Sequence, residues 1–171
     1  MHTLLTLRDS DVFPGSQNND PSGFSLRRAA RAVILNHKDQ VALLKVGKWY
    51  YHKLPGGGVE ASEDMQLALE RELLEEVGCR AEIVQEVGEI IEFQNEASKK
   101  QISHCWLARQ IGDATEPSFT SKEQREGFAV VWADDIASAI ALLSHDKPTD
   151  YTGNFIRQRD LRFLEAAKAL S

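Results

Sequence analysis

The sequence has few cysteines and no long apolar run. Only two of its 171 residues are cysteine, Cys79 and Cys105, so no disulfide framework holds the chain together. We expect both to be reduced core residues of an intracellular protein. The longest apolar stretches, 127–133 and 137–143, fall far short of the ~20 residues of a membrane helix, and residues 1–11 lack the apolar region of a secretory signal. These absences predict a cytoplasmic protein without a membrane partner.

Positive charge is also scarce. Twenty Lys and Arg residues stand against twenty-six Asp and Glu residues, which gives a net charge of −6 and a pI near 5.4. Proteins that bind nucleic acids or anionic membranes usually present a net basic face, so this balance argues against both partners. An acidic chain can still act on phosphates when metal ions neutralise them. The remaining composition, 42% hydrophobic and 27% charged, is that of a globular domain with a full core.

The pattern along the chain predicts one α+β domain. Residues 1–28 combine a short strand around Leu5–Leu7 with a loop rich in Pro, Gly and Asn, and are either part of the domain at 29–171 or appended to it. Strands are expected at 32–35, 41–46, 82–87, 88–93, 102–108 and 127–132. Helices are expected at 65–77, from Asp134 or Asp135 to Leu143, and from Thr152 or Asn154 to Leu170.

The predicted helix at 65–77 carries an acidic flank. Ser62 is a candidate N-cap, and Gly78 stands where a glycine commonly ends a helix. On a helical wheel five apolar residues form a stripe that we expect to face the core: Leu67, Leu69, Leu73, Leu74 and Val77. Three carboxylates share an arc of about 100° that we expect on the opposite side. They are Glu72, Glu75 and Glu76.

A helix that gathers like charges in this way repels itself unless a cation neutralises them. Each like-charged pair three or four residues apart costs about 0.2–0.5 kcal/mol. Magnesium prefers oxygen ligands and usually takes one or two carboxylates together with substrate phosphates and water. Gly57, in the turn just upstream, would let the backbone approach such an ion and offer its carbonyl. Arg71 could pair with Glu63 and pin this turn to the helix. The alternative is a solvated acidic face.

These residues form a motif with fixed spacing. Five residues follow Gly57, then come Glu63, seven further residues, and the run Arg71-Glu72-Leu73-Leu74-Glu75-Glu76-Val77-Gly78-Cys79. This segment resembles the Nudix box of the Nudix hydrolases at every fixed position except the last, where Cys79 replaces an aliphatic residue. Such a match arises by chance on the order of once in 10⁸ starting positions. Leu54-Pro55-Gly56-Gly57 and Trp132 extend the resemblance over most of 29–143.

The resemblance implies a fold and a reaction. The fold is the Nudix fold, an α/β/α sandwich with a mixed β-sheet and a loop–helix–loop catalytic motif. The reaction is hydrolysis of a nucleoside diphosphate linked to a group X, by attack of water on phosphorus with Mg²⁺ or Mn²⁺. The resemblance makes Gly57, through its carbonyl, and Glu72, Glu75 and Glu76 the metal ligands. It makes Arg71 and Glu63 structural support.

The general base varies among proteins of this family. It is a box glutamate in some, which here makes Glu72 or Glu75 catalytic, and a glutamate of a later loop in others. For the later loop we select Glu126, because it directly precedes the strand expected at 127–132. Glu123 is the second choice. Either residue could instead be an ordinary exposed carboxylate.

Residues for substrate binding are harder to identify. Lysines that lead into the motif could hold phosphates, although lysine is mostly a surface residue. They are Lys45, Lys48 and Lys53. Four aromatic residues could stack a base, although aromatics near strands are more often core residues. They are Tyr50, Tyr51, Phe93 and Phe155. Asn154 could hydrogen-bond a purine edge.

Two substrate signals of the family are missing. No proline lies between Cys79 and Glu116, where ADP-ribose hydrolases tend to have one, and no tyrosine follows the motif before Tyr151, where dinucleoside polyphosphate hydrolases tend to have one. A nucleoside triphosphate, including an oxidised one, or a nucleotide sugar is therefore the favoured small-molecule partner.

The alternative function is a nucleotide-sensing module without hydrolysis, although the motif is unbroken. An isomerase would need a nucleophilic cysteine, and Cys105 sits in an apolar run. The C-terminal helix, which carries Arg157, Arg159 and Arg162, is expected to pack as an amphipathic helix. It could also line a homodimer interface or the substrate mouth.

Overall fold

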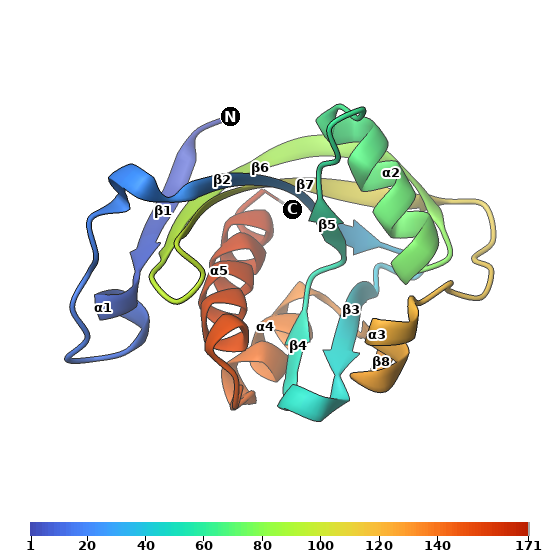
Figure 1. Cartoon of the computed structure of the whole chain (residues 1–171). Coiled ribbons are helices and arrows are strands. Elements are labelled where there is room, and N and C mark those ends of the chain that lie inside the picture. The colour runs from blue at the N-terminus through green and yellow to red at the C-terminus, as the bar shows by residue number, and fades with distance from the viewer. Residues whose placement is uncertain (171) are drawn as a thin grey trace.

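A computed structural model describes residues 1–170 as a twisted mixed sheet with helices on both faces (Figure 1). The strands are β1 (Thr3–Arg8), β2 (Ser25–Leu35), β3 (Val41–Val46), β4 (Tyr51–Lys53), β5 (Gly56–Gly58), β6 (Arg80–Gln94), β7 (Lys99–Ile111) and β8 (Phe128–Ala133). The helices are α1 (Asp9–Val12), α2 (Met65–Glu76), α3 (Ser121–Arg125), α4 (Ile136–His145) and α5 (Tyr151–Lys168), with 3-10 turns at Pro21–Gly23 and Gly47–Trp49. The expected α+β fold with a mixed sheet is confirmed.

The sheet has the order β1-β6-β7-β2-β3-β4, with β5 added to β2 and β8 added to β3. The pairs β1–β6 and β2–β7 are parallel, whereas β6–β7 and β3–β8 are antiparallel. Helix α2 packs over one face, and α4 with α5 packs over the other (Figure 1). Each face therefore has its own apolar core, and the sheet separates the two.

Most predicted strands form, and two of them are joined. The runs expected at 82–87 and 88–93 are one strand, β6, whose register shifts near its middle. Gly88 lies at this point with a φ of +148°, and a Cβ there would overlap the side chain of Leu4 from the neighbouring β1. The glycine thus marks a bulge within the strand and not a turn between two strands.

The three longer helices, α2, α4 and α5, begin at aspartates. Asp64, and not Ser62, caps α2, because its carboxylate accepts from the amides of Gln66 and Leu67, both at 2.9 Å. Asp135 caps α4 as expected, and its carboxylate accepts from the amide of Ser138. The last helix begins earlier than expected, with its N-cap at Asp150. A carboxylate also favours the positive end of a helix dipole, which adds to the capping bond.

The buried face of α2 differs from the prediction. Leu67 and Leu74 are 53% and 43% exposed, although we expected both in the core. The helix instead buries Ala68, Leu69, Leu73 and Glu76. At about 100° per residue, Glu76 lies only about 20° around the helix from Leu69, so the acidic flank borders the apolar stripe. The small Ala68 allows this face to pack on the sheet. The expectation that the glutamates oppose the core is therefore wrong.

The N-terminal residues lie along the sheet edge. Strand β1 pairs in parallel with β6. The carboxylate of Asp9 accepts from the Tyr151 hydroxyl at 2.7 Å and from the Asn95 amide at 2.9 Å, and so connects this region to α5 and to the β6–β7 turn. Cys79 and Cys105 are both buried and free. Within residues 1–170, no helix combines the length and the apolar character needed to cross a membrane.

Gly78 ends α2 in a conformation that only glycine adopts without strain, and this generates a stability prediction. Its φ is +71°, and a Cβ there would overlap the Thr115 carbonyl. We expect Gly78→Ala to lower the free energy of unfolding by about 2–5 kcal/mol, measured by urea denaturation. Gly112→Ala is the matched control, because Gly112 has a φ of +65° with nothing within 4 Å. It should cost only about 1–2 kcal/mol. Equal losses would contradict the steric explanation.

Candidate active site

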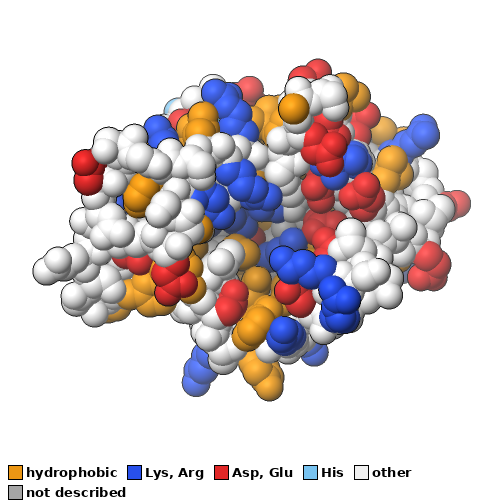
Figure 2. Space-filling view, in the orientation of Figure 1, with side chains coloured by type: hydrophobic (Ala, Val, Ile, Leu, Met, Phe, Trp, Pro, Cys, Tyr) orange, Lys and Arg blue, Asp and Glu red, His pale blue; other side chains and the backbone are white. Residues whose placement is uncertain are grey.

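A cavity of about 360 Å³ lies between α2, α5 and the turn at β5. One side, which we call the acidic wall, consists of Glu72, Glu76, Glu123 and Glu126 from α2 and the α3 region. The other side, which we call the basic wall, consists of Arg27, Arg31, Lys99 and Arg159 from β2, β7 and α5. Acidic and basic side chains flank the central hollow in Figure 2. Opposite charges thus meet across a space large enough for a small molecule.

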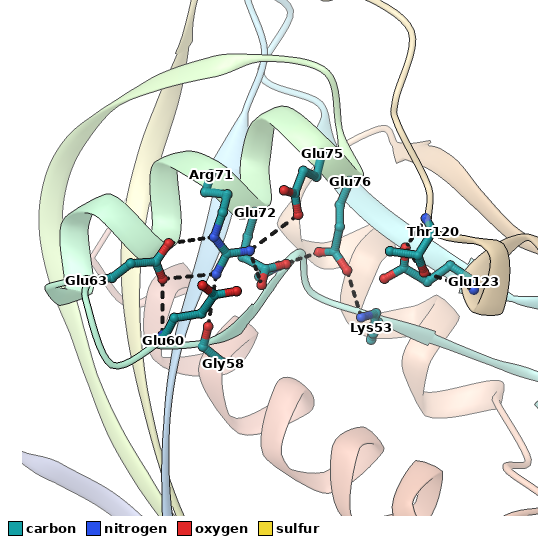
Figure 3. A network of polar contacts seen from close by, with 11 residues as sticks. Lys53, Gly58, Glu60, Glu63, Arg71, Glu72, Glu75, Glu76, Thr120 and Glu123 are labelled. Carbon is teal, nitrogen blue, oxygen red and sulfur yellow. Dashed lines mark hydrogen bonds and ion pairs between the residues drawn. The ribbon is translucent and has the colours of Figure 1, made fainter.

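Arg71 connects the acidic flank of α2 to the turn before it (Figure 3). Its Nε donates to Glu63 at 2.6 Å, and its Nη2 donates to the Gly58 carbonyl at 3.1 Å. Its Nη1 donates to Glu72 at 2.9 Å and to Glu75 at 3.3 Å. These bonds, above all the one to Glu63, raise the pKa of Arg71. The expected Arg71–Glu63 ion pair forms, and one guanidinium orients three carboxylates.

Glu76 is the buried member of the acidic wall, with 2% of its surface exposed. Its carboxylate accepts from the Gly56 amide at 2.6 Å and from the Lys53 ammonium at 2.9 Å. Burial raises the pKa of Glu76, and Lys53 with the Gly56 amide opposes that rise. A buried carboxylate needs such partners, because desolvation of an unpaired charge is costly. The two bonds therefore fasten the end of α2 to β4 and β5.

Glycines are required where β5 approaches both β2 and α2. Gly56 has a φ of +122°, and a Cβ there would overlap the Ala30 carbonyl. A Cβ on Gly57 would overlap the carboxylate of Glu72. The missing side chain thus lets the Glu72 carboxylate lie directly against the backbone of Gly57. A close approach at Gly57 was expected from the sequence, but for a metal ion.

The proposed metal ligands fit a divalent ion by chemistry but are engaged with other groups. Within residues 1–170, no three His, Cys, Asp or Glu side chains are gathered closely enough to hold a metal as they stand. Glu72 and Glu75 are bound to Arg71, and Glu76 is bound to Lys53. The three glutamates nevertheless offer only oxygen donors, the type that Mg²⁺ and Mn²⁺ prefer. Glu72 lies beside Gly57, which has no Cβ to block the approach of an ion.

The two candidate bases from the later loop differ in their contacts. The carboxylate of Glu123 accepts from the Thr120 amide at 2.7 Å and from its hydroxyl at 2.9 Å, which forms a capping box for α3. Glu126 ends this helix, and its backbone carbonyl accepts from the Lys48 amide at 2.9 Å. No group in the described part of the chain donates to the Glu126 carboxylate, which lines the cavity. Glu126 is therefore the freer of the two.

Of the polar residues predicted to bind substrate, only Lys53 lines the cavity. Its ammonium also lies 4.9 Å from the centre of the Phe128 ring. Lys45 is exposed on β3 and takes no part in the lining, so the structure does not place it at the cavity. Asn154 also lies away from the cavity, beside another hollow, and its amide donates to the carbonyls of Asp150 at 2.8 Å and Pro148 at 3.3 Å. The Asn154 amide thus satisfies backbone carbonyls at the start of α5.

The predicted aromatic residues do not line the cavity either. Phe155 and Tyr51 are buried, and Phe155 belongs to the core on the α5 face of the sheet. Phe93 is covered by the Arg8 guanidinium, 4.3 Å from the ring centre, and Tyr50 is exposed elsewhere. The aromatic residue that lines the cavity is Phe128. The structure thus gives no support for base stacking by the four predicted residues, because they lie in the core or on the surface away from the cavity.

Of the basic wall, the sequence pointed only to Arg159, in a helix that could line the substrate mouth, whereas Arg27, Arg31 and Lys99 were missed. Arg31 interrupts a strand that is otherwise buried and apolar from Ala29 to Leu35, and this interruption was a usable signal. Arg159 lies four residues from Phe155 and four from Phe163, on the buried face of α5. A cation at a core position of a helix or strand needs a buried partner or a ligand. That criterion would have selected both arginines.

Comparison with known proteins gives one consistent result. The sequence model of the NUDIX domain matches residues 25–148. Bovine (Bos taurus) diphosphoinositol polyphosphate phosphohydrolase 3-beta is 27% identical over 132 residues, which cover 75% of each chain. A NUDIX hydrolase from Nitrosomonas europaea superimposes with a TM-score of 0.63 at 17% identity, covering 85% of this chain and 90% of that one. The E. coli ORF135 protein gives 0.60 at 20% identity, with 86% and 91% covered. The last two likenesses establish the fold.

The Arg71–Glu63 pair generates a pH prediction. Folding lowers the pKa of Glu63 from its ordinary value of 4.5, mainly because Arg71 donates to its carboxylate. The stability that this pair contributes is therefore fully present above pH 4.5 and is lost as the pH falls through the lowered value. We expect Glu63→Gln to lower the Tm at pH 7, by a difference from wild type that shrinks below pH 4.5. Calorimetry from pH 3 to 7 measures it.

The control is Glu70→Gln, which removes an exposed carboxylate of α2, the helix that carries Arg71, without breaking a hydrogen bond or ion pair. It should leave the Tm within error of wild type at every pH. A Glu63→Gln difference that stays constant across the range would show that the ion pair is not its cause.

Proposed function

We propose that this chain, which belongs to the Nudix family of pyrophosphohydrolases, cleaves the diphosphate linkage of a nucleoside diphosphate joined to a group X. A nucleoside triphosphate, including an oxidised one, or a nucleotide sugar is favoured over ADP-ribose and dinucleoside polyphosphates. One observation carries the proposal: Glu72, Glu76 and Glu126 line the same cavity, and a wall of cations faces them. A diphosphate with its counterions matches this distribution of charge.

The metal site proposed here uses Mg²⁺ or Mn²⁺, as Nudix hydrolases generally use divalent metals. The ligands would be the Gly57 carbonyl and the carboxylates of Glu72, Glu75 and Glu76. When bound, the ion would neutralise phosphate charge and lower the pKa of a coordinated water. Arg71 keeps Glu72 and Glu75 oriented through its bonds to both. Lys53, which donates to Glu76 and lines the cavity, would pair with a substrate phosphate when the ion neutralises Glu76 instead.

Glu126 is the proposed general base. Its carboxylate lines the cavity opposite β5 and has no protein donor, so it can accept the proton of the attacking water. Glu123 is less suitable, because its carboxylate caps α3. Glu72 and Glu75 are the catalytic alternatives within the motif, but both already accept from Arg71.

The proposed reaction takes place on a small molecule in the cytoplasm. The partner is a small phosphorylated molecule, and neither nucleic acid nor membrane takes part. The two free cysteines fit a reducing cytoplasm. A homodimer remains open. A nucleotide-sensing module without hydrolysis is the competing function, and it would bind nucleotides without releasing phosphate or nucleoside monophosphate under any metal condition. An assay of a nucleotide panel with and without Mg²⁺ distinguishes the two.

The base assignment predicts a large effect on turnover. We expect Glu126→Gln to lower kcat by about 10²–10⁴-fold, because the amide cannot accept the proton, while Mn²⁺ binding remains. Glu123→Gln should have a much smaller effect, since glutamine also serves in a capping box. The measurement is steady-state product release with the best substrate of the panel. The reverse order of the two variants would transfer the role to Glu123.

The metal assignment predicts a loss of cation affinity. We expect Glu72→Gln and Glu75→Gln each to weaken Mn²⁺ binding by at least about tenfold, measured by titration calorimetry, because each removes a charged ligand. Glu70→Gln, on the exposed face of the same helix, should bind Mn²⁺ as wild type does. If all three variants bind equally, the acidic flank of α2 is not the metal site.

A further inference from the structure

Arg31 is a buried cation that the fold leaves without enough partners. Its side chain is 5% exposed, comes from β2 and lines the cavity. Its Nε and Nη1 atoms are buried, and no acceptor in residues 1–170 bonds to either. Burial and the neighbouring Arg159 lower the pKa of Arg31 to about 10. Buried donors without acceptors destabilise a fold, so this arginine is not explained by stability.

Arg159 is held rigidly beside it. This side chain is 1% exposed, and its Nε donates to Asp160 at 2.7 Å while its Nη1 donates to Glu92 at 3.4 Å. Those carboxylates have partners of their own, since Asp160 accepts from the Leu54 amide and Glu92 accepts from Gln101. Nη2 of Arg159 is buried and has no acceptor in the described chain. One nitrogen of a fixed guanidinium is thus left at the cavity.

Arg27 and Lys99 extend this group toward the glycine turn. Nη1 of Arg27 donates to Gln101 at 2.6 Å. A Cβ on Gly58 would come into tight contact with Nη2 of Arg27, so the guanidinium reaches the turn that also borders the acidic wall. Burial lowers the pKa of both Arg27 and Lys99, which lies on β7. Four cations therefore share a partly dehydrated space.

The surrounding carboxylates balance only part of this charge: Glu72 acts on Arg27 and Glu76 on Arg31 without a direct contact. Only two carboxylates, Glu92 and Asp160, contact this group directly, and both are bound to Arg159. The acidic wall lies across the cavity and makes no hydrogen bond or ion pair with Arg27 or Arg31 among the described residues. An anion that entered the basic wall would accept from the free donors and relieve the repulsion between the arginines.

We propose that the basic wall, Arg27, Arg31, Lys99 and Arg159, binds a phosphate group of the substrate that lies outside the scissile diphosphate. This inference rests on the proposed function and narrows it. The substrate would then carry three or more phosphates, as a nucleoside triphosphate or another polyphosphorylated molecule does. A nucleotide sugar with an uncharged X has no phosphate beyond the scissile pair, so it would supply no anion to this wall. Phe128 is the one aromatic residue among the lining residues of the described chain, and it does not belong to the basic wall. This also favours an anionic group over a stacked base in this part of the cavity.

The test uses the whole chain and inorganic tripolyphosphate in metal-free buffer, so that neither hydrolysis nor the metal site is involved. We expect wild type to bind tripolyphosphate more tightly than orthophosphate. Arg31→Met, which keeps the volume and removes the charge, should weaken tripolyphosphate binding at least about tenfold in titration calorimetry. Arg31→Lys should weaken it less. Arg80→Gln, which removes an exposed arginine that forms no ion pair, should bind as wild type does.

A thermal measurement separates binding from a structural role. Without any anion, Arg31→Met should have a Tm equal to or higher than that of wild type, because it removes an unpaired buried cation. Tripolyphosphate should raise the Tm of wild type and not that of the variant. A lower Tm for the variant without anion, together with unchanged tripolyphosphate affinity, would overturn the proposal, as would a wild type that does not bind tripolyphosphate.

The two proposals can fail separately. If tripolyphosphate binds through Arg31 but no substrate is hydrolysed, the anion subsite stands and the hydrolase function falls. If hydrolysis occurs and Arg31→Met lowers kcat/KM for triphosphates and nucleotide sugars to the same extent, the subsite assignment falls and the hydrolase function stands. Selective loss on triphosphates, by about tenfold or more, supports both.

Discussion

A buried carboxylate sets the geometry on which the rest of the site depends. Glu76 lies on the packed face of α2 and accepts from the Gly56 amide and from Lys53. Since a buried charge is tolerated only where donors meet it, these contacts fix both the rotation of the helix and its position along β5. With α2 fixed in this way, Glu72 lies against Gly57 and Arg71 reaches the Gly58 carbonyl. The apolar stripe alone would allow a different rotation.

The cavity separates charge within a protein that is acidic as a whole. A net charge of −6 repels a phosphorylated ligand at long range, but this effect is screened within about 10 Å at ordinary salt. Inside the cavity the local charges decide. The acidic wall would hold cations, and the basic wall would hold anions, so a chain of phosphates with its counterions can span both. A single-signed cavity could attract only one of these components.

The sequence was informative where contacts are local. The spacing from Gly57 to Cys79 predicted the helix at 65–77, its glycine end and the pairing of Arg71 with Glu63, because all of these partners lie within one turn and one helix. It was less informative about which side of that helix is buried. Leu67 and Leu74 are as apolar as Leu69, and only the packing of the sheet leaves them exposed.

The basic wall could not be assembled from the sequence, because β2, β7 and α5 bring together residues from 27 to 159. Asn154 and Lys45 lie away from the cavity for a related reason. Both have suitable side chains, but the start of α5 holds Asn154, and Lys45 lies on an exposed face of β3.

Anomalous diffraction from crystals soaked in Mn²⁺ tests the central claim most directly. The account predicts a peak between the Gly57 carbonyl and the Glu72, Glu75 and Glu76 carboxylates. Manganese bound elsewhere, with this flank still paired to Arg71 and Lys53, would contradict it.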